Sequence, residues 1–281
     1  TGAHFGHVTR KWNPKFKPHI LLEKNVVHII NLESTIEGFN KAAAFVKEII
    51  SKNGEILFVG TKKQAQDIVQ QEADKCSMFY IVERWLGGTL TNFSTIKKSI
   101  KRLKMLEKEG SNLYENLTKK ETQMLNRERV KLADQHRGIK DMRRLPDAVI
   151  VVDAQYEDTA IREAKRLYIP VIAIVDSNTD PTKVDYPIPA NDDSIRTIQL
   201  IIAALADAIN EARGTAAEKN KKKSEKKLET GVSEQSVPEE VAVEEVVEVT
   251  AENSEETPEP AETPEVQESE DTSKDSTQDS E

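Results

Sequence analysis

Short runs of apolar residues alternate with segments of helical periodicity along most of the chain. Some runs are apolar at consecutive positions, as at 56–59 and 149–152, which is typical of strands buried on both faces. Alternation of such strands with helices favours an α/β fold in three layers, with a parallel sheet between two layers of helices. The pattern predicts five parallel strands, at residues 26–32, 55–61, 78–84, 148–153 and 171–176.

Four helices are predicted to cover this sheet, because apolar residues recur at spacings of three and four and so share one helix face. The last helix, over 193–213, has a wide apolar face that must pack on the core and close the domain. Tyr168 and Pro170 end the third helix before the next strand. The residues expected on the buried faces are Ile36, Phe39, Ala43, Val46 and Ile50; Ala65, Ile68, Val69, Ala73 and Cys76; Ile161 and Ala164; and Ile195, Ile198, Ile201, Ile202, Leu205 and Ile209.

Residues 91–144 interrupt the alternation, because they contain no strand and are heavily basic. Their apolar residues form two narrow seams of the kind found in coiled coils. Residues 110–112 supply a turn, and Thr118 with Glu121 forms a capping box for a second helix. We therefore predict an inserted coiled-coil α-helical hairpin. Its seams consist of Phe93, Ile96, Ile100, Leu103 and Leu106, and of Leu125, Leu132 and Ile139.

The net charge of −9 combines two parts of opposite sign. Residues 215–281 hold 21 acidic residues and 7 lysines, so the rest of the chain is basic, with 33 Lys and Arg against 28 Asp and Glu. From Val237 onward the sequence has no aromatic residue and is too polar to bury a core. We therefore expect a disordered acidic C-terminal tail, which begins with a Lys-rich stretch.

These patterns divide the chain into an N-terminal arm at 1–25, a parallel-sheet domain formed by 26–90 and 145–214, the hairpin at 91–144 and the tail at 215–281. The single cysteine, Cys76, excludes an intramolecular disulfide and a zinc site built from cysteines, and it suits a reducing compartment. No apolar run approaches the roughly 20 residues that span a bilayer. We expect a soluble, cytoplasmic protein with no membrane partner.

Chemistry at the carboxyl ends of the strands is the alternative to a purely binding role. The loop 60–63, Gly-Thr-Lys-Lys, lies where a doubly wound sheet holds phosphate, but it lacks the further glycines of a phosphate-binding motif. We favour a tight turn with solvated lysines over a nucleotide site. Gly87-Gly88 is likewise too sparse for a phosphate site and favours a turn into the hairpin.

Several aspartates follow the predicted strands and should gather at one edge of the sheet. Such a group can hold a divalent ion or act as acid and base, but it can also anchor loops and cap the last helix. No Ser/His/Asp or Cys/His set accompanies them, and His4, His7, His19 and His28 match no closed metal site. We favour structural roles, without catalytic residues, metal or cofactors. The aspartates are Asp153, Asp176, Asp180, Asp192 and Asp193.

The stronger signals concern a polyanion. Five cations crowd the first hairpin helix before any acid, and the arm mixes cations with aromatic rings and prolines. Contact with phosphates is favoured over a solvated helix face, although acids interleave in the second helix. In the arm, Trp12 and Phe16 either stack on bases or fill the protein's own core. The candidate RNA-binding residues are Arg10, Lys11, Trp12, Lys15, Lys17, Arg84, Asn92, Lys97, Lys98, Lys101, Arg102, Lys104, Arg137, Lys140 and Arg143.

Several sequence blocks, in order, resemble the signatures of the bacterial-type small-subunit ribosomal protein two family, from about His4 to Arg213. The chain departs from the family pattern at Arg137, where a second glycine often stands, and at Arg143 and Arg144, which replace small residues. RNA contacts there are expected to differ. The blocks are HFGH at 4–7, WNPK at 12–15, VHIINL at 27–32, RWLGGTLTN at 84–92, GIKDM at 138–142, LPDA at 145–148, IVD at 174–176 and DYPIPANDD at 185–193.

The resemblance implies a flavodoxin-like sheet with a protruding coiled-coil hairpin, and a structural, non-enzymatic role in the small ribosomal subunit. It implies contact with small-subunit rRNA between head and body, in the bacterial cytoplasm or an organelle. It also implies neighbouring ribosomal proteins as partners, including docking of ribosomal protein one, rather than a homo-oligomer. A flavodoxin-like nucleotide-binding protein or enzyme is the alternative, because one fold hosts many functions.

Overall fold

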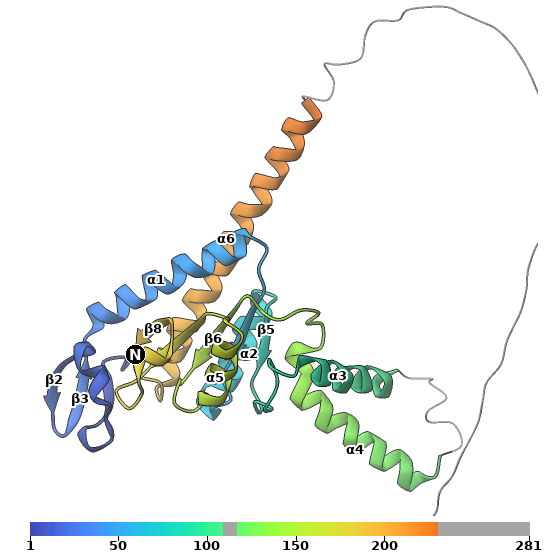
Figure 1. Cartoon of the computed structure of the whole chain (residues 1–281), viewed down its shortest axis with the longest axis horizontal. Coiled ribbons are helices and arrows are strands. Elements are labelled where there is room, and N and C mark those ends of the chain that lie inside the picture. Colours follow the sequence, from blue (N-terminus) through green and yellow to red (C-terminus); the bar gives the residue numbers. More distant parts are fainter. Residues whose placement is uncertain (109–116, 230–281) are drawn as a thin grey trace, which may run out of the picture. The chain divides into compact units, whose positions relative to one another are not determined.

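The computed structural model describes the backbone of residues 1–108 and 117–229, and the surroundings of side chains as far as residue 215. The described residues belong to one compact unit, and Figure 1 shows its helices and strands, with labels on many of them. The predicted turn at 110–112 and the predicted tail beyond residue 229 lie outside the described residues.

Five parallel strands form a sheet in the order β5-β4-β6-β7-β8. Counted along the chain, this order is 2-1-3-4-5, which fits the flavodoxin-like arrangement, and it reverses between β4 and β6. The predicted α/β fold with five parallel strands is confirmed. The strands of the structure are β1 Phe5–Val8, β2 Ile20–Lys24, β3 Val27–Ile30, β4 Ile56–Val59, β5 Phe79–Ile81, β6 Ala148–Val152, β7 Val171–Val175 and β8 Tyr186–Pro189.

One of the five predicted strands was assigned to the wrong sheet. The run 26–32 contains β3, which is the middle strand of a separate antiparallel sheet with β1 and β2. The fifth parallel strand is β8 instead, and Pro187 and Pro189 concealed it because proline is rare inside a sheet. Proline lacks an amide hydrogen and is tolerated on an edge strand, and β8 lies at the edge.

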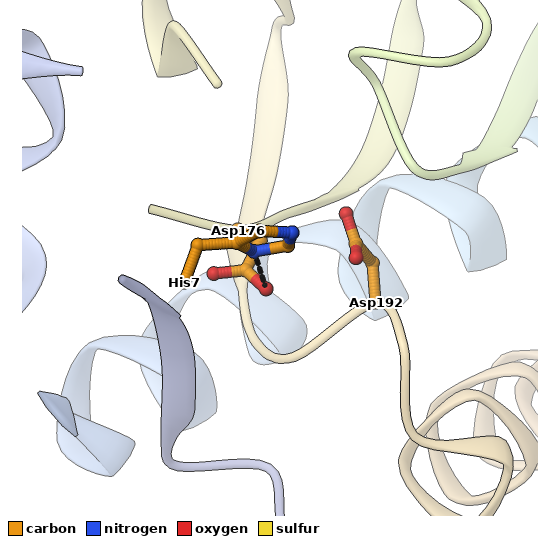
Figure 2. A group of neighbouring side chains, drawn as sticks. All are labelled: His7, Asp176 and Asp192. Carbon is orange, nitrogen blue, oxygen red and sulfur yellow. Dashed lines mark hydrogen bonds and ion pairs between the residues drawn. The ribbon is translucent and has the colours of Figure 1, made fainter. Parts of the chain in front are cut away.

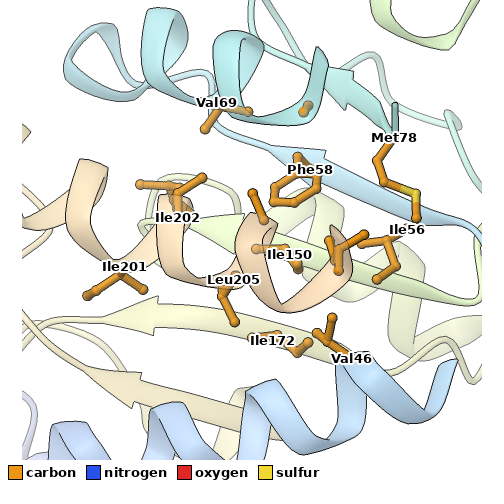
Figure 3. Close-up of a cluster of buried hydrophobic side chains, with 14 of the residues drawn as sticks. Val46, Ile56, Phe58, Val69, Met78, Ile150, Ile172, Ile201, Ile202 and Leu205 are labelled. Carbon is orange, nitrogen blue, oxygen red and sulfur yellow. The ribbon is translucent and has the colours of Figure 1, made fainter. Parts of the chain in front are cut away.

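Helices cover both faces of the parallel sheet. One face packs against α1, α2 and α6 around Val46, Phe58, Ile150 and Leu205, as Figure 3 shows. The opposite face, with Val149 and Val151, packs against α5 and the first turns of α3. The helices are α1 Leu32–Ser51, α2 Lys63–Lys75, α3 Phe93–Glu107, α4 Lys119–His136, α5 Asp158–Arg166 and α6 Ile195–Glu229.

Two helices differ from their predicted extent or face. Ile36 and Ile195 were expected to be buried, but 61% and 56% of their surfaces are exposed, so the core faces of α1 and α6 begin later. Helix α6 does not end at Arg213 but continues to Glu229, so the predicted disordered tail is helical at its start. Lys, Ala and Glu dominate this extension, and all three favour helix.

The segment inserted between β5 and β6 consists of α3 and α4, which contact each other. Ile100 and Leu103 of the predicted seam are buried, and the capping box of Thr118 and Glu121 is present. The Arg102 guanidinium holds the Glu128 carboxylate of the other helix with Nε–Oε1 and Nη2–Oε2 distances of 3.0 and 3.2 Å. A helical insertion is therefore present, while its supercoiling remains a prediction.

The N-terminal arm, residues 1–25, is folded. It contains β1, two short 3-10 helices at Thr9–Lys11 and Pro14–His19, and β2. Phe16 has no exposed surface and belongs to the core on the face of the parallel sheet that α5 covers, so it is not available to stack on a base. Trp12 is half-buried, and its ring centroid lies 5.0 Å from that of His28.

Tyr168 follows the end of α5 in a strained conformation. The amides of Ile169 and Tyr168 donate to the carbonyls of Ala164 and Lys165, which is a Schellman motif. Tyr168 occupies its left-handed position with φ 56°, although its side chain is 95% exposed. Glycine adopts this conformation without strain.

The Tyr168→Gly variant should therefore be more stable than the parent protein by about 1 kcal/mol. Urea denaturation would measure the difference. The control is Tyr168→Ala, which removes the ring but keeps the strain and should bring no comparable gain. Equal stability of the glycine and alanine variants would contradict the argument.

Candidate nucleic-acid interface

Lys62 occupies the point where the strand order of the parallel sheet reverses. It follows β4, and its ammonium lies 3.0 Å from Asp153 Oδ2, 2.9 Å from Asp192 Oδ1 and 2.6 Å from Asp193 Oδ1. Burial opposes the charged form, but the hydrogen bonds to Asp193 and Asp192 outweigh it and raise the pKa of Lys62. The crevice where such sheets bind ligands is thus filled by the protein's own ion pairs.

The loop that follows β4 is also engaged by a carboxylate. Glu157, at the start of α5, accepts hydrogen bonds from the Thr61 amide at 2.8 Å and from the Thr61 hydroxyl at 2.5 Å. A bound phosphate would need this amide as a donor. Burial raises the pKa of Glu157. These contacts disfavour the alternative of a nucleotide site at 60–63.

The predicted gathering of aspartates is confirmed for all but one of them, and His7 joins the group. His7 Nδ1 lies 2.9 Å from Asp176 Oδ2, and this hydrogen bond raises the pKa of His7 (Figure 2). Burial, together with the charges of Asp153 and Asp176, raises the pKa of Asp192. Asp180 lies apart from the group and pairs with Lys15 at 2.6 Å.

His7, Asp176 and Asp192 offer one nitrogen and two carboxylate oxygens within 4.8 Å of one another. Such donors match the ligands of zinc and related divalent ions. The second oxygen of Asp192, Oδ2, has no hydrogen-bond partner among the described residues. Sequence reasoning had treated the histidines and the aspartates separately. His7 is held at this edge by its contacts with Ser177 and Asp176, which lie far from it in the sequence, so no spacing reveals the group.

A basic groove of about 430 Å³ lies between α3 and the segment that leaves the hairpin. It brings together five of the predicted RNA-binding residues from both ends of the insertion. We call it the hairpin groove. It is lined by Lys97, Ile100, Lys101, Lys104, Lys140, Asp141, Met142 and Arg143.

The cations of the hairpin groove differ in their partners. Lys104 pairs with Asp141 at 3.0 Å, Lys140 pairs with Glu107, and the Lys97 ammonium lies 4.7 Å above the Phe93 ring. By contrast, Lys101 and Arg143 make no hydrogen bond or ion pair with any described residue, and both are exposed. The groove therefore presents two cations that have no counterion within the described chain.

Other predicted RNA-binding residues are engaged within the protein. Lys15 pairs with Asp180, and burial of that carboxyl is outweighed by hydrogen bonds from Lys15 and Thr182, which lower the pKa of Asp180 to about 2. Arg102 bridges the two hairpin helices. Arg137 Nη2 donates to Gln70 Oε1 at 2.8 Å.

Asn92 has a local structural role at the start of α3, where its side-chain oxygen accepts hydrogen bonds from Ser94 and Thr95. The remaining predicted residues are exposed cations that make no hydrogen bond or ion pair with the described residues. These are Arg10, Lys11, Lys17, Arg84 and Lys98.

Glu163 of α5 organises the loop between β5 and the hairpin, and sequence reasoning did not identify it. One carboxylate oxygen accepts hydrogen bonds from Trp85 Nε1 at 3.0 Å and the Gly88 amide at 2.8 Å. The other accepts from the Leu90 amide at 3.0 Å, and from the amide and hydroxyl of Thr91 at 3.2 and 3.1 Å. Glu163 is buried, so these bonds fix the entry into α3.

The fold and these surfaces define a class, that of α/β proteins that carry a cation-rich helical insertion on a parallel sheet. The chain belongs to the ribosomal protein S2 family, since the sequence model of the family described as Ribosomal protein S2 matches residues 1–212. Its class is therefore that of structural proteins of the small ribosomal subunit. Within the part of the chain that the structure describes, no helix is long and apolar enough to span a membrane.

Proposed function

We propose that this protein holds small-subunit rRNA through the hairpin groove and through the exposed cations of the arm, while the parallel sheet serves as their support. The observation that carries the proposal is the groove itself, where cations from both ends of the insertion converge. Phosphates of RNA supply the negative counterions that Lys101 and Arg143 lack within the described chain. The contact is expected to depend on salt, because bound cations release counterions from the RNA.

Cations with and without internal partners should contribute differently. A phosphate must displace a carboxylate from Lys104 or Lys140, whereas at Lys101 it replaces only water and ions. Exposed ion pairs are weak, typically below about 1 kcal/mol, so displacement costs little but reduces the gain. Lys101 and Arg143 are therefore expected to dominate the affinity of the groove.

Charge reversal tests this expectation. Lys101→Glu with Arg143→Glu should weaken binding of the full chain to purified small-subunit rRNA about tenfold or more at low salt. The dependence of log affinity on log salt should also become shallower by about 1 to 2. Both quantities come from filter binding over a salt series.

Lys41→Glu with Arg166→Glu is the matched control, since it places the same charges on exposed positions of α1 and α5. The control should bind nearly as well as the parent protein. If the Lys101 and Arg143 variant kept its full affinity for rRNA, the hairpin groove would be excluded as an RNA-binding site. Absence of any RNA binding by the parent chain would exclude the whole proposal.

The position of the protein within the small subunit and its docking of ribosomal protein one also belong to this proposal. Its support is the resemblance of the sequence blocks, which implies a location between head and body, in the cytoplasm, and docking of ribosomal protein one. Sedimentation of a cell extract on a sucrose gradient should place the chain with small subunits. Depletion of the chain should release ribosomal protein one from those subunits, and its retention would contradict the docking role.

A further inference from the structure

A second hollow, of about 610 Å³, lies beside α4 and is distinct from the hairpin groove. One wall is formed by Glu83 and Arg84, which follow β5, and the other by one face of α4 between Gln123 and Gln135. It shares no lining residue with the hairpin groove. Volumes of this order are typical of sites for small organic molecules.

Three amide side chains distinguish this hollow from an ordinary basic surface. Gln123, Asn126 and Gln135 line it, and none of them makes a hydrogen bond with any described residue. Each amide offers a donor and an acceptor side by side, which matches the edge of a nucleobase. Val130, 54% exposed, adds an apolar surface on which a base can pack.

The charges of the hollow favour a nucleotide over a densely charged ligand. Arg84, Arg127 and Lys131 line it, but Glu83 and Asp134 lie among them, so the net charge is small. None of these five side chains is paired within the described chain. A run of acidic residues in a peptide would meet two carboxylates, whereas a nucleotide brings one phosphate and a neutral base.

We propose that this hollow receives one unpaired nucleotide of RNA, with its base against the amides of Gln123 and Asn126 and its phosphate near Arg84. This inference rests on the proposed RNA-binding function and adds a site that recognises an unpaired base of the RNA. Proteins recognise unpaired bases in this way, because the edges of paired bases in an RNA helix are poorly accessible.

The test is the double variant Gln123→Ala with Asn126→Ala, which leaves the net charge unchanged. Both positions are exposed on a helix, where alanine is well tolerated. The full chain would be titrated with four single-stranded RNA oligonucleotides of about seven nucleotides, each made of one kind of base. It would also be titrated with an RNA duplex of about 16 base pairs. The matched control is Gln64→Ala with Gln71→Ala, because both residues are exposed on α2 and lie outside the hollow.

The variant should lose about tenfold in affinity for at least one unpaired oligonucleotide and keep its affinity for the duplex. The control should keep both affinities. Unchanged binding of all unpaired oligonucleotides, an equal loss on the duplex, or equally strong competition by polyglutamate would each overturn the nucleotide site. If the parent chain bound neither form of RNA, the RNA-binding function itself would fail.

Discussion

Glu163→Ala is expected to lower the free energy of unfolding by about 3 kcal/mol or more. The substitution removes the acceptor of the Trp85 indole and of the Gly88 and Leu90 amides at once. A donor left unsatisfied in a buried place costs about 1 to 3 kcal/mol, and the losses are not additive. Urea denaturation of the parent and variant proteins would give the difference.

The ionisation of Glu163 adds a dependence on pH. Burial opposes the charged form, but hydrogen bonds from Trp85, Gly88 and their neighbours outweigh it and lower the pKa of Glu163. The folded pKa lies below the unfolded one, so this stabilisation is complete above the unfolded value and is lost as the pH falls through the folded one. The stability gap between the parent protein and Glu163→Ala should therefore narrow from neutral pH to below about pH 4.

The variant should also bind RNA less well, because the loop that Glu163 holds leads directly into α3 and the hairpin groove. Glu37→Ala is the control, since Glu37 is exposed on α1. Glu163→Gln should remain destabilised, because its NH₂ group would meet amide donors instead of accepting from them. A change below about 1 kcal/mol for Glu163→Ala would show that the loop finds other acceptors.

The strands that sequence alone predicted well are those whose surroundings are apolar on both sides. The runs that became β4, β6 and β7 consist of apolar residues because helices cover both faces of the sheet. An apolar run does not reveal which strands will pair, and β3 was assigned to the wrong sheet for that reason. The strand β8 escaped notice because two of its four residues are proline.

The candidate site was predictable in its charges but not in their partners. Clustering of lysines in 97–104 is visible in the sequence, since residues three and four apart share a helix face. The pairing of Lys104 with Asp141 depends on the return of the chain after α4, which no spacing encodes. Glu163 was missed for a similar reason, because a charged residue beside Ile161 and Ala164 is usually solvated.

Gly138→Ala is the other substitution with a large expected effect, and it tests how the hairpin is fixed to the sheet. Gly138 lies in the 3-10 helix Arg137–Ile139, which follows α4 and contacts β5. A methyl group on Gly138 would lie within 3.0 Å of the Tyr80 carbonyl oxygen and of the Tyr80 ring. The oxygen belongs to the backbone of a paired strand and cannot move aside cheaply.

The expected cost is about 3 kcal/mol, at the upper end of what overpacking causes. The displaced segment carries Lys140 and Arg143, so affinity for small-subunit rRNA should fall along with stability. Gly87→Ala is the matched control, because a methyl group there meets nothing within 4 Å and should change stability little. If the two alanine variants unfolded at the same urea concentration, the insertion would not depend on close contact with β5. Retention of full RNA affinity by Gly138→Ala would show in turn that the hairpin groove tolerates movement of one of its walls.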